Sequence, residues 1–170
     1  CGTATDRAVR FLRSQQRSDG AWLPLWFGNQ DVAGDENPTY GTSRVLLACR
    51  DLISDRPELN DLMVRGAAWL AGSQNADGGF GGGGGTQSTL EETGLAVEAL
   101  CSLPASAGVP ASGIHSGIAW LTEAVERMAW QEPSPIGFYF AKLWYFERLY
   151  PLVFSIAALR RARSWLRGSV

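Results

Sequence analysis

The sequence predicts an all-α protein built from consecutive helix pairs, an α/α toroid of which this chain supplies a part. The first observation is a motif, Gln-x-x-Asp-Gly-x-aromatic, that occurs at 16–22 and again at 74–80, 58 residues later. The second is that the residues ahead of the two copies also match, since Phe11-Leu12 corresponds to Trp69-Leu70 at the same spacing. Self-similarity at such a period indicates a repeat of one supersecondary unit.

Each motif is expected to form a turn. Asp can accept a hydrogen bond from the backbone that follows it, and Gly adopts the positive φ that a side chain resists. The aromatic residue can return over the Gln, whose amide can reach an unpaired backbone group of a neighbouring helix end. We interpret the motif as a clamp between helices, because turn residues of this type usually serve geometry; the alternative is a ligand site at Gln and Asp. The residues are Gln16, Asp19, Gly20 and Trp22 in the first copy and Gln74, Asp77, Gly78 and Phe80 in the second.

The first elements follow from capping and periodicity. Thr3 or Thr5 can cap a helix over 6–16. A turn and an extended stretch rich in Gly, Asp and Asn follow over 19–38. The next helix is predicted from about residue 40 to residue 53, and its apolar residues on most sides indicate burial.

The middle of the chain continues the pattern. A helix is predicted over 57–73, and the glycine-rich stretch 78–85 is predicted to be a flexible turn. No Lys-Ser/Thr pair follows these glycines, so they do not form a phosphate-binding loop. Residues 88–91 read as a capping box that opens a helix through Leu103, which Pro104 ends.

The last third is expected to be helical as well. After a loop over 105–113, a helix begins near Ser116. The aromatic stretch 138–146 is assigned to the final helices, the last of which begins at Pro151 because proline suits a first helical turn. The basic residues of 160–167 complement the end of that helix.

The predicted helices group into three repeats, at about 6–57, 58–113 and 114–170. Helix pairs that repeat in this way close into a toroid in which inner and outer helices alternate. About six helices make only part of such a ring, so we interpret residues 1–170 as a segment of a longer protein.

Composition excludes several classes of protein. The net charge is −2 and no basic stripe occurs, so nucleic acid is not an expected partner. No apolar run approaches the ~20 residues of a membrane span. The cysteines, Cys1, Cys49 and Cys101, are odd in number and widely spaced, and His115 is the single histidine. We therefore expect buried thiols in a reducing, cytoplasmic compartment, with no metal and no cofactor.

Three stretches of this sequence, in the same order along the chain, resemble motifs of a known protein family. The chain is similar to the C-terminal part of squalene–hopene cyclases and related class II triterpene cyclases. Its motifs at 16–22 and 74–80 match the QW motifs of that family. Residues 88–100 match the family pattern S-T-x-x-x-T-x-x-A-x-x-A-L, and 135–151 resemble the aromatic segment before its last helix. The resemblance covers nearly the whole chain.

The resemblance implies an (α/α)₆ barrel, monotopic attachment to a membrane, and cyclisation of a polyene started by protonation. On this basis the chain is expected to be the C-terminal segment of such a cyclase and to line its cavity. The implied partners are a squalene-type isoprenoid lipid, the N-terminal part of the cyclase and a membrane surface. The implied location is cytoplasmic and peripheral to the membrane.

The resemblance also implies site residues. Trp26 matches a cavity tryptophan, and Tyr40 matches a tyrosine near the protonation end, an auxiliary catalytic candidate. Tyr139 stands where the family has a Phe that faces a developing cation, whereas Leu143 replaces a family Tyr. Aromatic faces stabilise a cation by about 0.5–2 kcal/mol without quenching it, although aromatic residues at helical spacing also commonly form a core. The expected substrate-binding residues are Trp26, Tyr40, Phe138, Tyr139, Phe140, Trp144 and Phe146.

The acid of the family lies in a D-x-D-D motif, which this sequence does not contain. The adjacent acid pairs are Asp35-Glu36 and Glu91-Glu92, and the capping box explains Glu91 better than catalysis does. We therefore expect the chain alone to be inactive. A proton donor has to come from the rest of the cyclase.

Alternatives remain open. The chain could instead be a non-catalytic α/α-toroid module that binds a lipid or a protein. A zinc-dependent prenyltransferase β subunit would share the fold, but Cys101 and His115 do not complete a convincing Asp, Cys and His triad. The apolar surface over 143–154 is either a membrane anchor or a face buried against the remainder of the barrel.

Overall fold

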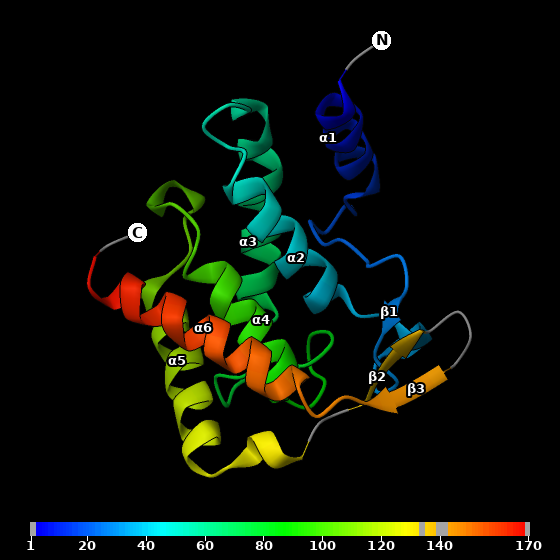
Figure 1. Cartoon of the computed structure of the whole chain (residues 1–170). Helices are drawn as coiled ribbons and strands as arrows, with labels where there is room; N and C mark the ends of the chain where they lie inside the picture. The colour runs from blue at the N-terminus through cyan, green and yellow to red at the C-terminus, as the bar shows by residue number, and fades with distance from the viewer. Residues whose placement is uncertain (1–2, 133–134, 139–142, 169–170) are drawn as a thin grey trace.

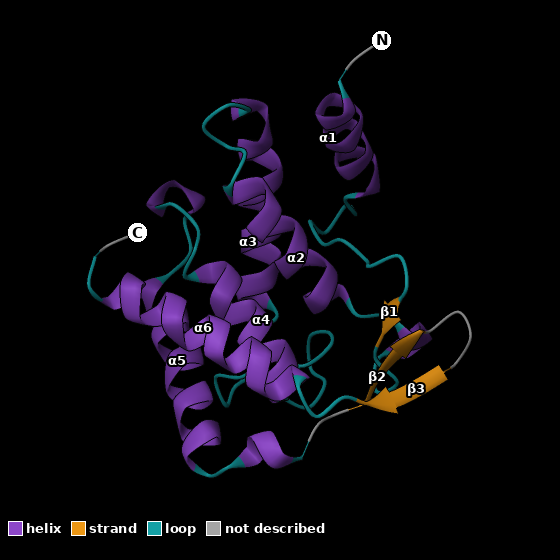
Figure 2. Ribbon diagram, in the orientation of Figure 1, coloured by secondary structure: helices purple, strands orange, loops and turns teal. Residues whose placement is uncertain are grey.

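The computed structural model describes residues 3–132, 135–138 and 143–168. These residues form six α-helices and a small antiparallel sheet of three short strands (Figure 2). The helices are α1 Ala4–Gln15, α2 Pro38–Arg50, α3 Asn60–Gly72, α4 Leu90–Leu100, α5 Ala111–Glu126 and α6 Tyr150–Leu166. The strands are β1 Phe27–Gly28, β2 Pro135–Phe138 and β3 Leu143–Phe146.

The predicted repeats pair α1 with α2, α3 with α4 and α5 with α6. Helices α2 to α6 pack against one another, and this mostly helical architecture confirms the predicted fold class. The second members of the pairs, α2, α4 and α6, form a row in which α4 contacts both neighbours (Figure 1). The first members pack behind that row, α3 against α2 and α4, and α5 against α4 and α6. Because α4 has a neighbour on each side, all of its residues except Glu98 are buried.

The ends of the helices test the predicted boundaries. Thr3 caps α1 in a capping box, in which its Oγ1 accepts from the Asp6 N–H at 3.1 Å and the Asp6 carboxylate accepts from the Thr3 N–H at 2.7 Å. Helix α2 begins at Pro38, two residues earlier than predicted, because Asn37 caps it by accepting from the Tyr40 N–H.

Three predicted boundaries in the middle of the chain are wrong. The cap of α4 is Thr89, not Ser88, so the third helical position is Glu92 and not Glu91. That helix ends at Leu100, before the predicted Leu103. Helix α5 already begins at Ala111, so the predicted loop over 105–113 is too long.

The glycine-rich turn is packed into the protein. Residues 78–83 are buried, and only Gly84 and Gly85 are exposed. A Cβ on Gly82 would lie 2.6 Å from Nδ2 of Asn29, so a larger residue would force these two segments apart. The prediction of a turn is confirmed, but the glycines serve close packing rather than an exposed, flexible loop.

The prediction that 138–146 is helical is wrong for the described residues. Strands β2 and β3 form an antiparallel pair with Gly137 opposite Trp144, and β1 adds to β2 with Phe27 opposite Phe138. A run of apolar and aromatic residues suits a strand as well as a buried helix, and the strand that completes the sheet is distant in sequence. Pro151 does lie in the first turn of α6, as predicted. Among the described residues, no helix has both the length and the apolar character needed to cross a bilayer.

Candidate functional site

The first motif joins α1 to α3. The Gln16 amide Nε2 donates to the Gly20 carbonyl at 2.9 Å, which closes the turn, and to the Leu62 carbonyl at 3.0 Å, which lies in the first turn of α3. The Arg65 guanidinium also donates to Oε1 of Gln16. Gly20 has a φ of +100°, and the Asp19 carboxylate accepts from the Ala21 N–H at 3.1 Å.

The second motif repeats this arrangement between α3 and α5. The Gln74 amide donates to the Gly78 carbonyl at 2.8 Å and to the Gly113 carbonyl at 2.9 Å, in the first turn of α5. In both copies the Gln amide therefore bonds a carbonyl inside the helix after the next one, α3 or α5, and not the unpaired helix-end group that the sequence predicted. The geometry is that of a clamp.

Asp77 is more strongly bonded than its counterpart Asp19. Its carboxylate accepts from the Gly79 N–H at 2.9 Å, the Ser88 hydroxyl at 2.9 Å and the Trp120 indole N–H at 3.0 Å. Burial raises the pKa of Asp77, but these hydrogen bonds together lower it by more, so the pKa lies below its ordinary value. Asp77 thus binds α5 to the turn.

The motif aromatics are core residues. Trp22 and Phe80 are almost fully buried, and each backbone N–H donates to a threonine of the following helix, Thr42 at 3.0 Å and Thr93 at 2.9 Å. The Trp22 indole also donates to the Leu12 carbonyl at 2.8 Å. Among the eight motif residues named in the sequence analysis, Trp22 is the one that also lines the cavity described next.

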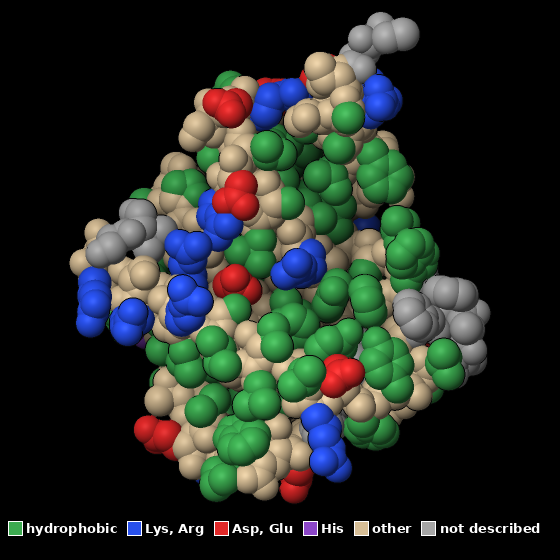
Figure 3. Space-filling model, viewed as in Figure 1, with side chains coloured by type: hydrophobic (Ala, Val, Ile, Leu, Met, Phe, Trp, Pro, Cys, Tyr) green, Lys and Arg blue, Asp and Glu red, His purple; other side chains and the backbone are tan. Residues whose placement is uncertain are grey.

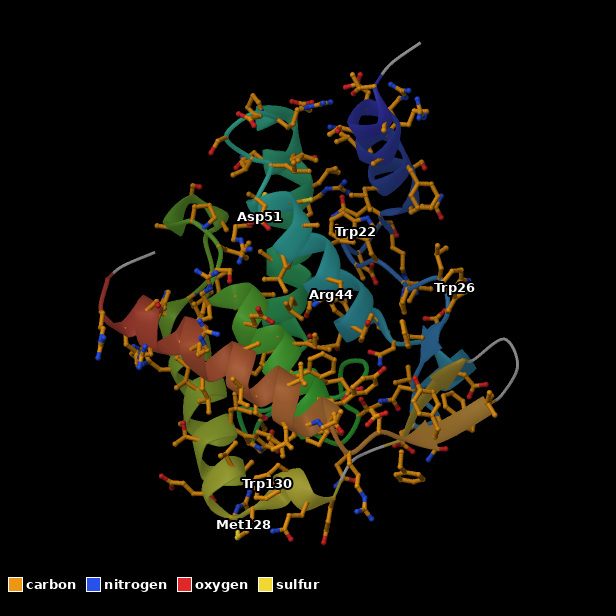
Figure 4. All side chains as sticks on the ribbon, viewed as in Figure 1. Trp22, Trp26, Arg44, Asp51, Met128 and Trp130 are labelled. Atoms are coloured by element: carbon orange, nitrogen blue, oxygen red, sulfur yellow. The ribbon has the colours of Figure 1, made fainter. Side chains whose placement is uncertain are left out.

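An open cavity of about 520 Å³ lies between α1, residues 22–27 and the first half of α2. Hydrophobic side chains gather over this region (Figure 3), and Trp22, Trp26 and Arg44 approach it from the 22–27 segment and α2 (Figure 4). A cavity with a mostly apolar wall and few polar groups is typical of a lipid or small-molecule site. The aromatic members of the wall are Phe11, Trp22, Trp26, Phe27 and Tyr40, and the charged ones are Arg17 and Arg44.

Tyr40 stands in the first turn of α2, with its ring centroid 4.9 Å from that of Phe27. Burial raises the pKa of the Tyr40 hydroxyl, nearby Tyr150 raises it further, and Arg44 opposes the shift. The phenol therefore stays neutral near neutral pH. Trp26 lines the same cavity and is 60% exposed.

Tyr145 and Tyr150 were not singled out from the sequence. Their hydroxyl oxygens are 3.5 Å apart, and this hydrogen bond, together with burial, raises the pKa of Tyr145 to about 12. Because successive strand residues point to opposite faces, β3 directs Trp144 and Phe146 away from the side that carries Tyr145. Recognition of a two-residue strand period in 143–146 would have placed Tyr145 on one face and Trp144 and Phe146 on the other.

The structure brings two of the expected substrate-binding residues, Trp26 and Tyr40, to one cavity. Trp144 is partly buried and Phe146 is 67% exposed on β3, and neither lines that cavity. The predictions for Tyr139, Phe140 and the side chain of Phe138 lie outside the described part of the chain.

The zinc alternative has no support in the part of the chain that the structure describes, where no group of His, Cys, Asp or Glu is arranged to hold a metal ion. Cys101 is buried, and burial raises its pKa to about 12, which disfavours the thiolate that binds zinc. His115 instead packs its ring edge-on against Trp165, with centroids 5.1 Å apart.

Comparison with known proteins finds one family and several relatives. The model of the squalene-hopene cyclase C-terminal domain matches residues 2–164. An enfumafungin synthase from Hormonema carpetanum is 30% identical over 150 residues, which are 81% of this chain and 10% of that protein. A copalyl diphosphate synthase from Streptomyces cyslabdanicus is 31% identical over 142 residues, 82% of this chain and 23% of the relative.

A solved structure shares the fold. The ent-copalyl diphosphate synthase from Streptomyces platensis superposes with a TM-score of 0.58 and 25% identity, over 94% of this chain and 27% of that one. The chain thus spans about a quarter or less of the length of these three relatives.

Proposed function

The chain belongs to the squalene-hopene cyclase C-terminal domain family, and from this premise we propose that residues 1–170 line the cavity of a class II terpene cyclase. The proposed reaction is the cationic polycyclisation of a squalene-type polyene, started by protonation. The observation that carries the proposal is the cavity that Trp26, Phe27 and Tyr40 share.

The chemistry of that cavity suits a migrating carbocation. Aromatic faces attract a cation by about 0.5–2 kcal/mol each and do not form a bond with it. In the part of the wall that the structure describes, no carboxylate is present to capture the cation. The raised pKa of Tyr40 keeps its oxygen neutral, which makes it a poor nucleophile.

The proton donor is proposed to belong to another part of the same cyclase, because this sequence contains no D-x-D-D motif.

The exposed face of helix α6 favours the presence of a further packed element. The face of α6 opposite α4 exposes Leu149, Val153 and Ile156, whereas α4, which has neighbours on both sides, is buried at every residue except Glu98. Further helices of the toroid would cover this face and the open side of the cavity. Peripheral attachment to the cytoplasmic face of a membrane, where a polyene dissolves, completes the proposal.

The test is to replace Trp26 and Tyr139 separately by Ala in the complete cyclase and to analyse the products formed from squalene. Loss of either ring should increase prematurely terminated products, since a partly cyclised cation is less well stabilised. Met128→Ala, at an exposed position outside the cavity, is the control. An unchanged product distribution in both variants would refute the cavity assignment. Binding of squalene without turnover would instead favour the non-catalytic lipid-binding module.

A further inference from the structure

A buried carboxylate links three segments beside the cavity. Glu92, in the first turn of α4, is only 4% exposed, although charged side chains are rarely buried without partners. Its Oε1 accepts hydrogen bonds from Nδ2 of Asn29 at 3.0 Å and from Nδ2 of Asn37 at 3.2 Å. Its Oε2 accepts from the hydroxyl of Thr89. Both asparagines are themselves buried.

The two asparagines stand at the two ends of one loop. Asn29 directly follows β1, which contains Phe27, and its Oδ1 accepts from the Asp31 N–H at 2.9 Å. Asn37 caps α2, and its Oδ1 accepts from the Tyr40 N–H at 3.0 Å. Each amide thus uses its oxygen to shape the local backbone and its nitrogen to bond Glu92.

We propose that Glu92 is a positioning residue that sets where Phe27 and Tyr40 stand in the cavity. It does not line the cavity itself. It fixes β1 through Asn29 and the start of α2 through Asn37, and the rings carried by these two elements are in contact at 4.9 Å. The catalytic meaning rests on the proposed function, whereas the positioning rests on these hydrogen bonds.

The hydrogen bonds from Asn29 and Asn37 require an acceptor at position 92. An apolar residue in place of Glu92 would leave two buried amide groups without acceptors, and an unpaired buried donor destabilises the fold. The loop over 29–37 would relax to reach water, and Phe27 and Tyr40 would move with its ends. Glu92→Gln keeps an acceptor at Oε1, and its new amide can donate to Thr89 if that hydroxyl turns.

A reversal of donors and acceptors distinguishes the hydrogen bonds to Glu92 from the capping of α2 by Asn37. Asn37→Asp keeps the oxygen that accepts from the Tyr40 N–H, since Asp is a good N-cap, but it places a second carboxylate against Glu92. The triple variant Asn29→Asp, Asn37→Asp and Glu92→Gln reverses both contacts, because the two N–H groups of the new Nε2 can donate one to each new carboxylate while the remaining oxygen still accepts from Thr89. Glu98→Ala, on the same helix at the position that is not buried, is the control.

The first readout is NMR on the 170-residue chain. We expect the proton–proton NOE between Phe27 and Tyr40 to persist in Glu92→Gln, Glu98→Ala and the triple variant. It should be lost in Glu92→Ala and in Asn37→Asp. Signals of Phe80 and Thr93 report whether each variant is folded. If Glu92→Ala does not fold, Asn37→Asp and the triple variant still test the proposal. The proposal is overturned if Glu92→Ala and Asn37→Asp both keep the NOE or if the triple variant fails to restore it.

The second readout is the product distribution of the complete cyclase from squalene. Misplaced rings should raise the fraction of prematurely terminated product about tenfold in Asn37→Asp, and the triple variant should return it towards the parent value. A cyclase that converts no squalene, with NMR results as expected, would refute the proposed function and leave the positioning intact. Normal products in Asn37→Asp despite a lost NOE would refute the catalytic meaning.

Discussion

The close approach of the first motif to α3 predicts a large effect of Gly20→Ala on stability. Gly20 has a φ of +100°, and a Cβ there would lie 2.5 Å from the backbone oxygen of Arg65. The left-handed backbone costs a side chain about 1–2 kcal/mol. The overlap with a helix backbone, which cannot rotate away, adds about 1–3 kcal/mol. We expect a net loss of about 2–4 kcal/mol, because alanine also restricts the unfolded chain by about 0.4–1 kcal/mol.

Two other glycines separate these contributions. Gly85 also has a positive φ, +80°, but a Cβ there meets nothing within 4 Å, so Gly85→Ala should cost only about 0–1 kcal/mol. Gly72 ends α3 without a positive φ and likewise has open space around it. Gly72→Ala should therefore stabilise the helix by about 0.5–1 kcal/mol.

The assay is urea unfolding of the 170-residue chain, followed by circular dichroism at about 222 nm, with the free energy of unfolding extrapolated to water. The difference between Gly20→Ala and Gly85→Ala measures the cost of the contact with α3. Equal losses in these two variants would refute the argument that the turn is pressed against that helix.

Further outcomes follow from the contacts and pKa directions. The folded state lowers the pKa of Asp77, so this carboxylate contributes stability above its unfolded pKa of about 4. In urea unfolding, the stability advantage of the parent chain over Asp77→Asn should therefore shrink as the pH falls through the pKa of folded Asp77. A difference that stays constant with pH would contradict this. Burial raises the pKa of Cys49 to about 11 and of Cys101 to about 12. Iodoacetamide at about pH 8 should therefore label both thiols slowly until urea unfolds the chain. Rapid labelling of Cys49 and Cys101 in the native chain would contradict their burial. Trp22→Phe removes the indole bond to the Leu12 carbonyl and should cost about 1–3 kcal/mol in the same unfolding assay, whereas an unchanged stability would mean that water replaces the indole.

The sequence predicted the features that short stretches of chain control. The periodicity of apolar residues located all six described helices to within a few residues, and Thr3 was one of two predicted caps. The repeated motif predicted a turn with a glycine at positive φ, which both Gly20 and Gly78 show. These features could be predicted because backbone preference and capping act within a few residues.

The candidate site was predicted less completely. Trp26 and Tyr40 do share a cavity, but the resemblance rather than any local pattern singled them out. The strand 143–146 was taken for helix, so Trp144 and Phe146 were grouped with residues from which the strand separates them. A shift of one residue in the cap of α4 gave the role of third helical residue to Glu92 instead of Glu91.

By itself, the sequence thus determined the fold class, the helix-pair repeat and the turns, since all of these follow from interactions within a few residues. Only the tertiary structure decided the pairing of β1 with β2, the meeting of Tyr145 and Tyr150, and the bonds from Glu92 to Asn29 and Asn37. Each of these depends on how separately formed elements dock. The hydrogen bond between Asn37 and Glu92 forms only after α2 and α4 have packed together, and no local sequence preference determines which of two adjacent glutamates then faces the loop.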